Sequence, residues 1–498
     1  MQTCSAGLPT ERYPDRYLAI WPGAIETVPF LHYTPGGRYL LLSTLGCNLS
    51  CPGCVSHILI DHQDALSEAM RPVSPEVVIS QVREHACEGV IFCLNEPSVS
   101  PRTVVRTARL IREAGLKAGC ATNGCMSSDI RDQFITCMDF MNIGIKGISD
   151  EAYSSCKAPC GISEVFHNIR EIYAANIHLE ISAVYQHGFD DDLIRLAEEI
   201  SGISDEIPLH IMRFIPFAGA DKAREPTPDE AASLLLRCRD HLPWVYLFNT
   251  PSVDHLSTVC PSCEKVLIRR SFYGPMGARL RGSGTTTCDC GRMVPVVGSF
   301  HTWQGCEPRF RGGYRTSVAL DTVAGTLQHL GIRDEQVIGR VLVRILSGTL
   351  LEDLQQYFAT PEGYIGYIRL LASYAGIEGP VMPLIRFYEQ RLDEIRRRVA
   401  GLPRPRVFCA LSHPLLPSYP DKMEVALADR AGGEVLNRRI AHQEDRESSF
   451  SREDFIALNP DVIICTGMGT CQPDEFREIF GPPIEERAKT DGDWSLIE

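Results

Sequence analysis

The stretch STLGCNLSCPGCVSH, residues 43–57, decides the fold, because it places Cys47, Cys51 and Cys54 on one short loop at offsets of four and three. A disulfide would leave one sulfur over, and a tetrahedral zinc ion needs a fourth ligand. Three thiolates can instead hold three irons of a [4Fe–4S] cube and leave the fourth iron without a protein ligand. The spacing therefore predicts a cluster with one open iron, and a zinc site or incidental cysteines are the alternatives.

The chain around this loop alternates strand-like and helical patterns. Strand-like apolar runs begin with RYLLLSTLG (38–46) and recur five times, ending with LHIMRF (209–214). Amphipathic helical patterns such as PRTVVRTARLIREAG (101–115) lie between them. Strand followed by helix, repeated six times, predicts an α/β fold with a parallel sheet covered by helices. Functional groups of such sheets lie on loops at the carboxyl ends of the strands, which is where the three cysteines fall.

Composition narrows the class of protein. A chain of 498 residues with 44% apolar and 22% charged residues predicts a globular protein of two or three domains. No apolar run approaches the roughly 20 residues of a membrane span, and the N-terminus lacks a signal-peptide pattern, so we expect a cytoplasmic protein without a membrane partner. The net charge of −14 argues against nucleic-acid binding. Twenty cysteines are many for a cytoplasmic chain and indicate metal ligands.

On these residues the chain resembles the radical SAM superfamily, whose fold is a partial (β/α)6 barrel. The resemblance implies that the open iron binds S-adenosylmethionine (SAM). It also implies that one electron splits SAM to a 5′-deoxyadenosyl radical, which takes hydrogen from an unactivated carbon. Gly53 departs from the family pattern, because most members have an aromatic residue there.

Four later segments match family motifs in the same order: FCLNEPSVS (92–100), ATNG (121–124), MNIGIKGISDEAY (141–153) and LHIMRFIP (209–216). The last two resemble pyruvate formate-lyase activase-like members. The resemblance implies cofactor-binding roles for Asn95, Glu96, Thr122, Asn123, Lys146, His210 and Arg213. Gly144 replaces the usual aspartate and Ile215 a frequent histidine. The sequence names no catalytic residue.

Two cysteine pairs follow the predicted barrel. Cys260 with Cys263, and Cys288 with Cys290, form C-x2-C and C-x-C motifs across a Gly-rich segment. This pattern predicts a tetrahedral four-sulfur site for zinc or a single iron, with an auxiliary iron–sulfur cluster as the alternative. A similar ribbon ends AmmeMemoRadiSam-type radical SAM proteins, and that similarity covers about residues 20–300. The cysteines of CKAPC (156–160) suit either ligation or packing.

The C-terminal part has a different pattern. A helix is predicted over about 380–400, and a second α/β unit begins at RVFCAL (406–411). Residues 375–498 resemble class III periplasmic binding proteins for cobalamin and siderophores, which implies a bound corrinoid. His413 is a candidate corrinoid-binding residue, and a loop-capping histidine is the alternative. The expected domains are a barrel (1–250), a cysteine-knuckle segment (251–305), a helical linker and spine (306–400) and a cobalamin-binding-protein-like α/β domain (401–498).

Together these features favour a cobalamin-dependent radical SAM methyltransferase that acts on an unactivated carbon of a protein residue. The expected cofactors are a [4Fe–4S] cluster, SAM, cobalamin, and zinc or iron at the second cysteine site. In domain order the chain resembles the glutamine C-methyltransferase of methyl-coenzyme M reductase, so that protein is the candidate substrate, alongside an electron donor. The alternatives are an activase-type radical SAM enzyme without cobalamin and a corrinoid or metal-chelate carrier.

Overall fold

A computed structural model describes residues 10–216, 219–250, 255–301, 314–348, 354, 356–411, 413–440 and 450–466. The chain divides into two compact units, residues 1–352 and 353–498. Within the described residues no helix has both the length and the apolar character that crossing a membrane requires.

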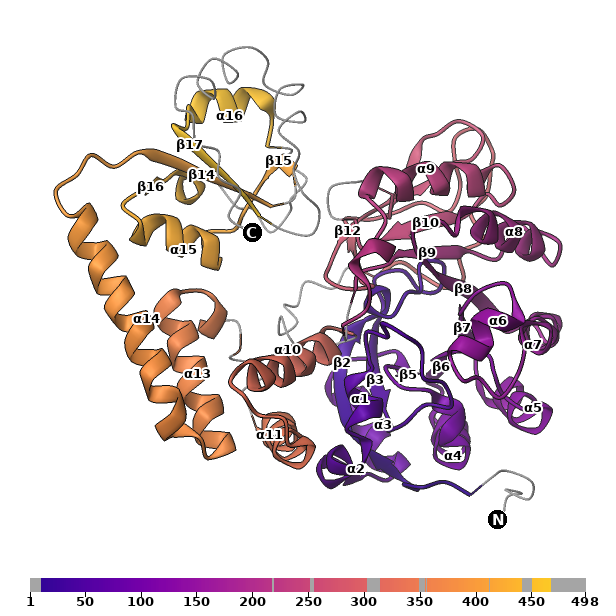
Figure 1. Cartoon of the computed structure of the whole chain (residues 1–498). Coiled ribbons are helices and arrows are strands. Elements are labelled where there is room, and N and C mark those ends of the chain that lie inside the picture. The colour runs from indigo at the N-terminus through magenta and orange to yellow at the C-terminus, as the bar shows by residue number, and fades with distance from the viewer. Residues whose placement is uncertain are drawn as a thin grey trace. The chain divides into compact units, whose positions relative to one another are not determined.

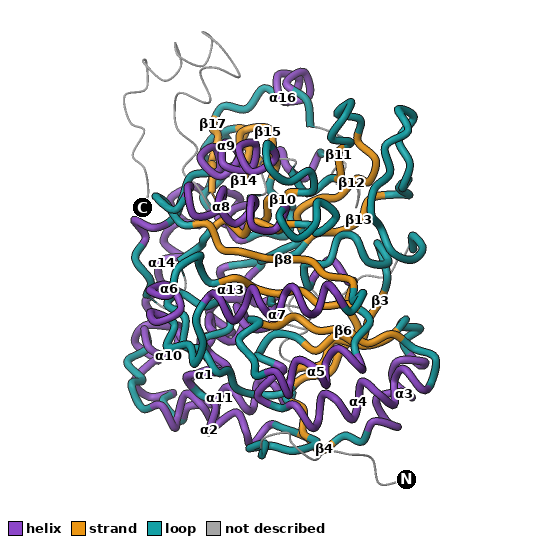
Figure 2. Tube along the Cα trace, turned by 90° about the vertical axis from the view of Figure 1, so that its right-hand side faces the viewer, coloured by secondary structure: helices purple, strands orange, loops and turns teal. Residues whose placement is uncertain are grey.

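The first unit is built on an eight-stranded sheet in the order β10-β9-β8-β7-β6-β5-β3-β2 (Figures 1 and 2). Neighbouring strands from β3 to β10 run parallel, and β2 is antiparallel to β3. The strands are β2 (Ala19–Ala24), β3 (Arg38–Ser43), β5 (Gly89–Phe92), β6 (Lys117–Thr122), β7 (Phe140–Ile145), β8 (His178–Tyr185), β9 (Leu209–Arg213) and β10 (Val245–Phe248). The mixed α/β class and the parallel sheet are confirmed, and the sheet is consistent with a partial barrel. The sequence analysis identified neither β2 nor β10.

Helices cover the outer face of this sheet (Figure 1), and they are α3 (Pro75–Glu84), α4 (Pro101–Glu113), α5 (Ser128–Cys137), α7 (Ile162–Ala174), α8 (Asp190–Ser201) and α9 (Pro228–Arg239). The short helices α1 (Ile58–Asp61), α2 (Gln63–Leu66) and α6 (Asp150–Ser155) lie in the segments that follow β3 and β7. Helix α4 shows why they form. Pro101 opens it, where a missing N–H costs nothing, and Val104, Ala108 and Ile111 form a buried stripe at offsets of four and three.

Smaller elements complete the first unit. A three-stranded antiparallel sheet consists of β11 (Thr258–Val259), β12 (Val266–Phe272) and β13 (Ala278–Arg281), and β1 (Arg16–Tyr17) pairs with β4 (Arg71–Pro72). Helices α10 (Arg315–His329) and α11 (Glu335–Ser347) pack against α1 and α2. They belong to the first unit, and the boundary between the two units falls within the expected helical linker and spine (306–400).

The second unit contains a helical pair and a small sheet. Its helices are α13 (Pro361–Ala375), α14 (Glu378–Val399), α15 (Met423–Arg430) and α16 (Arg452–Leu458), and its strands are β14 (Arg406–Leu411), β15 (His413–Pro417), β16 (Glu434–Val435) and β17 (Val462–Thr466). Strand β14 runs parallel to β16 and β17 and antiparallel to β15. Helix α14 matches the helix predicted over 380–400. Of its predicted apolar face, Val381 and Ile385 are buried, while Tyr388 and Ile395 are exposed.

Candidate functional site

A cavity of about 570 Å³ opens at the carboxyl ends of the parallel strands. All three cysteines of the 43–57 loop line it. So do the predicted cofactor-binding residues of four different strand ends, which are Asn95, Glu96, Thr122, Asn123, Lys146 and Arg213. The fold therefore gathers residues that are as far as 166 positions apart in sequence, from Cys47 to Arg213. Tyr314, just before α10, also lines the cavity, and no sequence motif indicated it.

The cysteine loop connects β3 to α1, and its three thiols are free and partly buried. The Leu49 N–H donates to the Cys47 sulfur at 3.3 Å. Burial raises the pKa of Cys47 to about 12 and also raises that of Cys54, while a hydrogen bond with the Cys156 thiol lowers the pKa of Cys51. Metal ligation requires these thiols to lose their protons, which burial opposes at Cys47 and Cys54 and which a bound cation would favour.

Glu96 braces two strand ends. One carboxylate oxygen accepts the Ser98 N–H at 2.9 Å and the Thr122 hydroxyl at 2.7 Å, and the other accepts the Asn123 N–H at 2.7 Å. The carboxylate is 3% exposed, so these bonds replace the water it has lost. Glu96 thus fixes the ends of β5 and β6 around the cavity.

Asn95 joins the same strand end to the beginning of the cysteine loop. Its side-chain amide donates to the Thr44 hydroxyl at 2.8 Å and to the Gly46 carbonyl at 3.1 Å, and its carbonyl accepts from the Ser43 hydroxyl at 3.2 Å. These hydrogen bonds fix the beginning of the cysteine loop relative to the end of β5.

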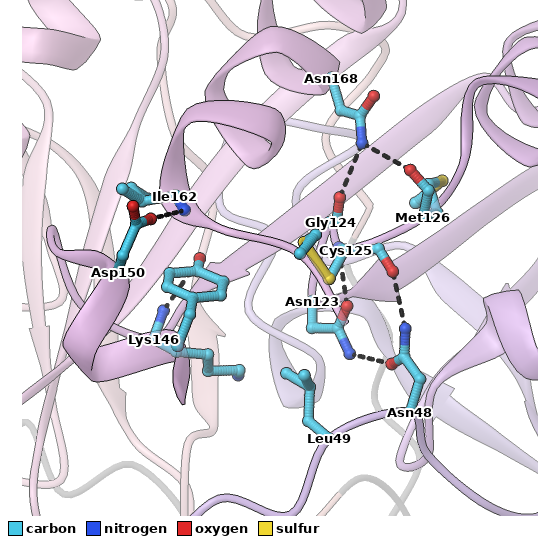
Figure 3. The surroundings of a disulfide bond; sticks show 12 residues. Asn48, Leu49, Asn123, Gly124, Cys125, Met126, Lys146, Asp150, Ile162 and Asn168 are labelled. Atoms are coloured by element: carbon cyan, nitrogen blue, oxygen red, sulfur yellow. Dashed lines mark hydrogen bonds between the residues drawn. A yellow bond between two sulfur atoms is a disulfide. The ribbon is translucent and has the colours of Figure 1, made fainter. Parts of the chain in front are cut away.

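A disulfide between Cys125 and Cys160 lies beside the loop (Figure 3). The Asn48 amide donates to the Cys125 carbonyl at 2.7 Å and accepts from Asn123 at 2.7 Å. Asn168 of α7 donates to two further carbonyls of the segment that holds Cys125. The sequence analysis did not foresee this pairing, because the two cysteines are 35 residues apart and share no motif. The disulfide connects the loop after β6 to the segment between α6 and α7.

Lys146 places its ammonium group near the thiols. Burial lowers its pKa, but the nearby Cys51 and Cys54 outweigh burial, so the pKa of Lys146 is raised overall. Gly144 makes room for this side chain, because a Cβ there would lie 3.1 Å from the Lys146 Nζ.

Gly53 has a structural explanation as well. Its φ of +71° is rarely adopted by other residues, and a Cβ there would lie 2.9 Å from the Phe214 ring. Phe214 follows β9 and lines the cavity, so an aromatic side chain stands next to the last cysteine although it comes from elsewhere in the chain.

Arg213 ends β9 and is 1% exposed. Its Nη1 donates to Glu225 at 2.8 Å and to the Pro226 carbonyl at 2.9 Å, and its Nε donates to the Asn249 carbonyl at 3.0 Å. Its Nη2 is buried without a hydrogen-bond partner, although the residue lines the cavity. An anionic group bound in the cavity would satisfy this donor.

His210 is not among the residues that line the cavity. It lies three positions before Arg213 on β9, about 10 Å closer to the amino end of the strand. Its Nε2 lies 2.6 Å from a Glu180 oxygen, and both side chains are fully buried. Glu180 also accepts from the backbone N–H groups of Leu31 and His32 and from the His178 ring. Although burial opposes its charge, these bonds hold the pKa of Glu180 well below its usual value. The structure thus gives His210 a place in a buried network below the cavity.

The second cysteine site lies on loops at the ends of the three-stranded sheet. Sulfur distances are 3.5 Å for Cys260 to Cys290 and 3.4 Å for Cys263 to Cys288, and all four sulfurs lie within 4.8 Å of one another. A tetrahedral zinc site with bonds of about 2.3 Å has its sulfurs about 3.8 Å apart. The four residues fit such an ion.

The side chain of His413 lies outside the described residues.

Comparisons with known proteins bear on the first unit. Residues 41–200 match the family described as the Radical SAM superfamily. The uncharacterized protein MJ0808 of Methanocaldococcus jannaschii is 27% identical over 286 residues, which cover 56% of this chain and 84% of that protein. The uncharacterized protein MJ0804 of the same organism is 25% identical over 170 residues, covering 34% of this chain and 54% of that protein.

Among solved structures, a domain of pyruvate-formate lyase-activating enzyme from Bacteroides vulgatus is 15% identical with a TM-score of 0.27, covering 32% of this chain and 97% of that one. Streptococcus suis SuiB is 12% identical with a TM-score of 0.34, covering 42% and 50%. These TM-scores are low, so the similarity rests on the family match. Residues 41–200 are similar to the radical SAM superfamily.

Proposed function

We propose that this protein is a radical SAM methyltransferase that transfers a methyl group to an unactivated carbon of a protein residue with the help of cobalamin. The observation that carries the radical SAM part is the set of three thiols on the wall of a cavity at the carboxyl ends of the strands. Three donors suit a cluster that keeps one iron for an exchangeable ligand. The family match over residues 41–200 supports the same cofactors.

The chain's own residues can hold both parts of the cofactor system. Cys47, Cys51 and Cys54 would hold a [4Fe–4S] cluster, which when bound with SAM supplies the electron and the radical chemistry. Glu96 and Asn123 shape the wall where SAM would lie, and the unpartnered Nη2 of Arg213 suits a carboxylate. Ala183 of β8 and Met212 of β9 give the cavity apolar wall area.

The cobalamin part rests on different support. The second unit has a long helix, α14, followed by a small α/β sheet, in the order expected from the corrinoid-binding resemblance. We infer that residues from about 310 onward, with His413 as a candidate contact, hold a corrinoid. On the same resemblance of domain order, the glutamine of methyl-coenzyme M reductase is the proposed target, and an external donor supplies electrons.

The test uses the full chain, purified and reconstituted without oxygen. With dithionite and SAM we expect 5′-deoxyadenosine and methionine. After incubation with hydroxocobalamin and gel filtration we expect a retained corrin spectrum. A peptide from methyl-coenzyme M reductase should then gain 14 Da, the mass of CH2 for H, with S-adenosylhomocysteine formed alongside.

Each outcome separates the alternatives. SAM cleavage without retained corrinoid favours an activase-type enzyme. Retained corrinoid without SAM cleavage favours a carrier. If the reconstituted protein holds no iron–sulfur cluster and splits no SAM, the proposal is wrong for the first unit as well.

A further inference from the structure

Helix α10 contacts the chain directly after the last cysteine of the loop. The Ser317 hydroxyl of α10 lies 3.0 Å from the Ser56 hydroxyl, and both residues are buried. An Asp321 oxygen lies 3.1 Å from the His57 Nε2. Figures 1 and 2 both show α10 beside α1, so these contacts join two segments that are about 260 residues apart.

His57 lies between Asp321 and Cys54 and contacts both. Its ring Nδ1 lies 3.0 Å from the Cys54 carbonyl oxygen, and its backbone N–H donates to the same oxygen at 3.1 Å. The His57 side chain is 15% exposed and that of Asp321 is 30% exposed, so neither is a freely solvated surface group. One ring nitrogen thus faces the carbonyl of a cluster cysteine and the other faces a carboxylate of α10.

We propose that Asp321 is a positioning residue for Cys54, which it acts on through His57, so that α10 is part of the radical SAM site. This inference rests on the proposed function, because it concerns the cysteine that would hold the cluster. Asp321 fixes the ring of His57, the ring fixes the Cys54 carbonyl, and the turn from residue 54 to α1 keeps one geometry. Partners that orient a metal ligand in this way typically contribute 10- to 100-fold to metal affinity or activity.

The chain offers a matched control next to this contact. His62 Nδ1 lies 3.1 Å from a Glu335 oxygen of α11, so the same helical segment makes a second histidine–carboxylate pair. His62 lies between α1 and α2, beyond the turn that holds Cys54. If α10 and α11 only dock on the cysteine loop segment, loss of either carboxylate should have the same effect on that segment. If Asp321 positions Cys54, only the loss of Asp321 should affect the cysteine.

The experiment compares Asp321→Ala, Asp321→Asn and Glu335→Ala in the full chain. Hydrogen exchange of the peptide spanning residues 54–61 is measured before reconstitution. Iron content, the EPR spectrum of the reduced cluster with and without SAM, and 5′-deoxyadenosine formation are measured after it. We expect Asp321→Ala to speed exchange in that peptide, to change the SAM-bound EPR spectrum and to slow 5′-deoxyadenosine formation roughly 10- to 100-fold. Asp321→Asn keeps an oxygen acceptor and should stay near wild type, as should Glu335→Ala.

Two results would overturn the inference, and they differ from failure of the proposed function. Wild-type protein that splits SAM, together with an Asp321→Ala variant that matches Glu335→Ala in exchange and in EPR, refutes the positioning role alone. Wild-type protein that takes up no cluster refutes the proposed function and this inference with it. A variant too unstable to purify is replaced by His57→Ala, for which the same changes are expected.

Discussion

The two cysteine sites of the first unit differ in the number of thiols and in what surrounds them. The loop at 47–54 presents three thiols to a cavity lined by Lys146, Glu96 and Arg213. The knuckle brings four thiols within 4.8 Å of one another, with Cys263 and Cys290 exposed. A four-thiol set completes a tetrahedron and leaves no position for a substrate, whereas a three-thiol set leaves one open. The first site is therefore suited to binding a reactant, and the second is suited to a structural metal ion.

The largest effect is expected for Cys51→Ala, which removes one of the three thiols of the first site. With two thiols left, the loop cannot hold three irons, so SAM cleavage should fall at least ~10³-fold, below detection. The metal content of the knuckle should stay unchanged, because its ligands come from other loops. Anaerobic 5′-deoxyadenosine assays and metal analysis of the same sample check both. SAM cleavage that survives in this variant would contradict the assignment of the loop.

Cys263→Ser tests the other site. Loss of a structural metal should lower the stability of the first unit by at least about 4 kcal/mol, seen as a large drop in Tm. Cluster absorbance per folded molecule should remain near wild type at low temperature. A Tm that is unchanged, or a cluster that disappears while the fold is intact, would mean that the knuckle is not a separate structural site.

Glu96→Gln is expected to have a smaller effect on the cavity wall. Gln keeps the shape but loses a charged acceptor that takes three hydrogen bonds, which costs about 2 kcal/mol, or roughly 30-fold in SAM affinity. Equilibrium dialysis of SAM with the reconstituted protein measures this loss. Glu84→Gln, an exposed change on α3, serves as the control. Equal affinities in the two variants would remove Glu96 from the site.

Glu88→Gln should have the smallest effect. It tests the contact between Glu88, just before β5, and His301, which follows the knuckle in sequence. Glu88 lies 3.1 Å from His301, and burial raises the pKa of Glu88 to about 7. Because the folded state holds this proton more tightly than the unfolded state, wild-type stability falls as the pH rises from about 4.5 to 7. The variant should therefore gain about 1 kcal/mol at pH 8, after allowance for solvent screening, and nothing at pH 4. Urea unfolding at the two pH values measures it, and an equal effect at both would exclude this origin.

Patterns among residues that are close in sequence predicted several strands, one long helix and the second cysteine site. Six parallel strands, α14 and the clustering of the knuckle cysteines follow from apolar periodicity and short spacing. The choice of Glu96, Lys146 and Arg213 came from the resemblance of their segments to family motifs, and the rule that parallel strands end at one edge of the sheet agrees with their gathering. Their assigned roles in binding a cofactor remain predictions.

Long-range contacts could not be predicted in this way. The Cys125–Cys160 disulfide and the His57–Asp321 pair join segments whose proximity is decided only when helices pack on the sheet. His210 illustrates a different limit, because a motif fixes the strand but not the depth of each side chain along it. The surroundings of Gly53 are another example, because the Phe214 ring beside it follows a strand far away in the sequence.

The Glu180 network has a consequence for how small molecules reach the cavity. Four donors hold one carboxylate in a fully buried layer, so the described part of the sheet around Glu180 is packed and hydrogen-bonded. The cavity itself opens at the carboxyl ends of the strands, so a small molecule that binds beside the three thiols would enter and leave on that side.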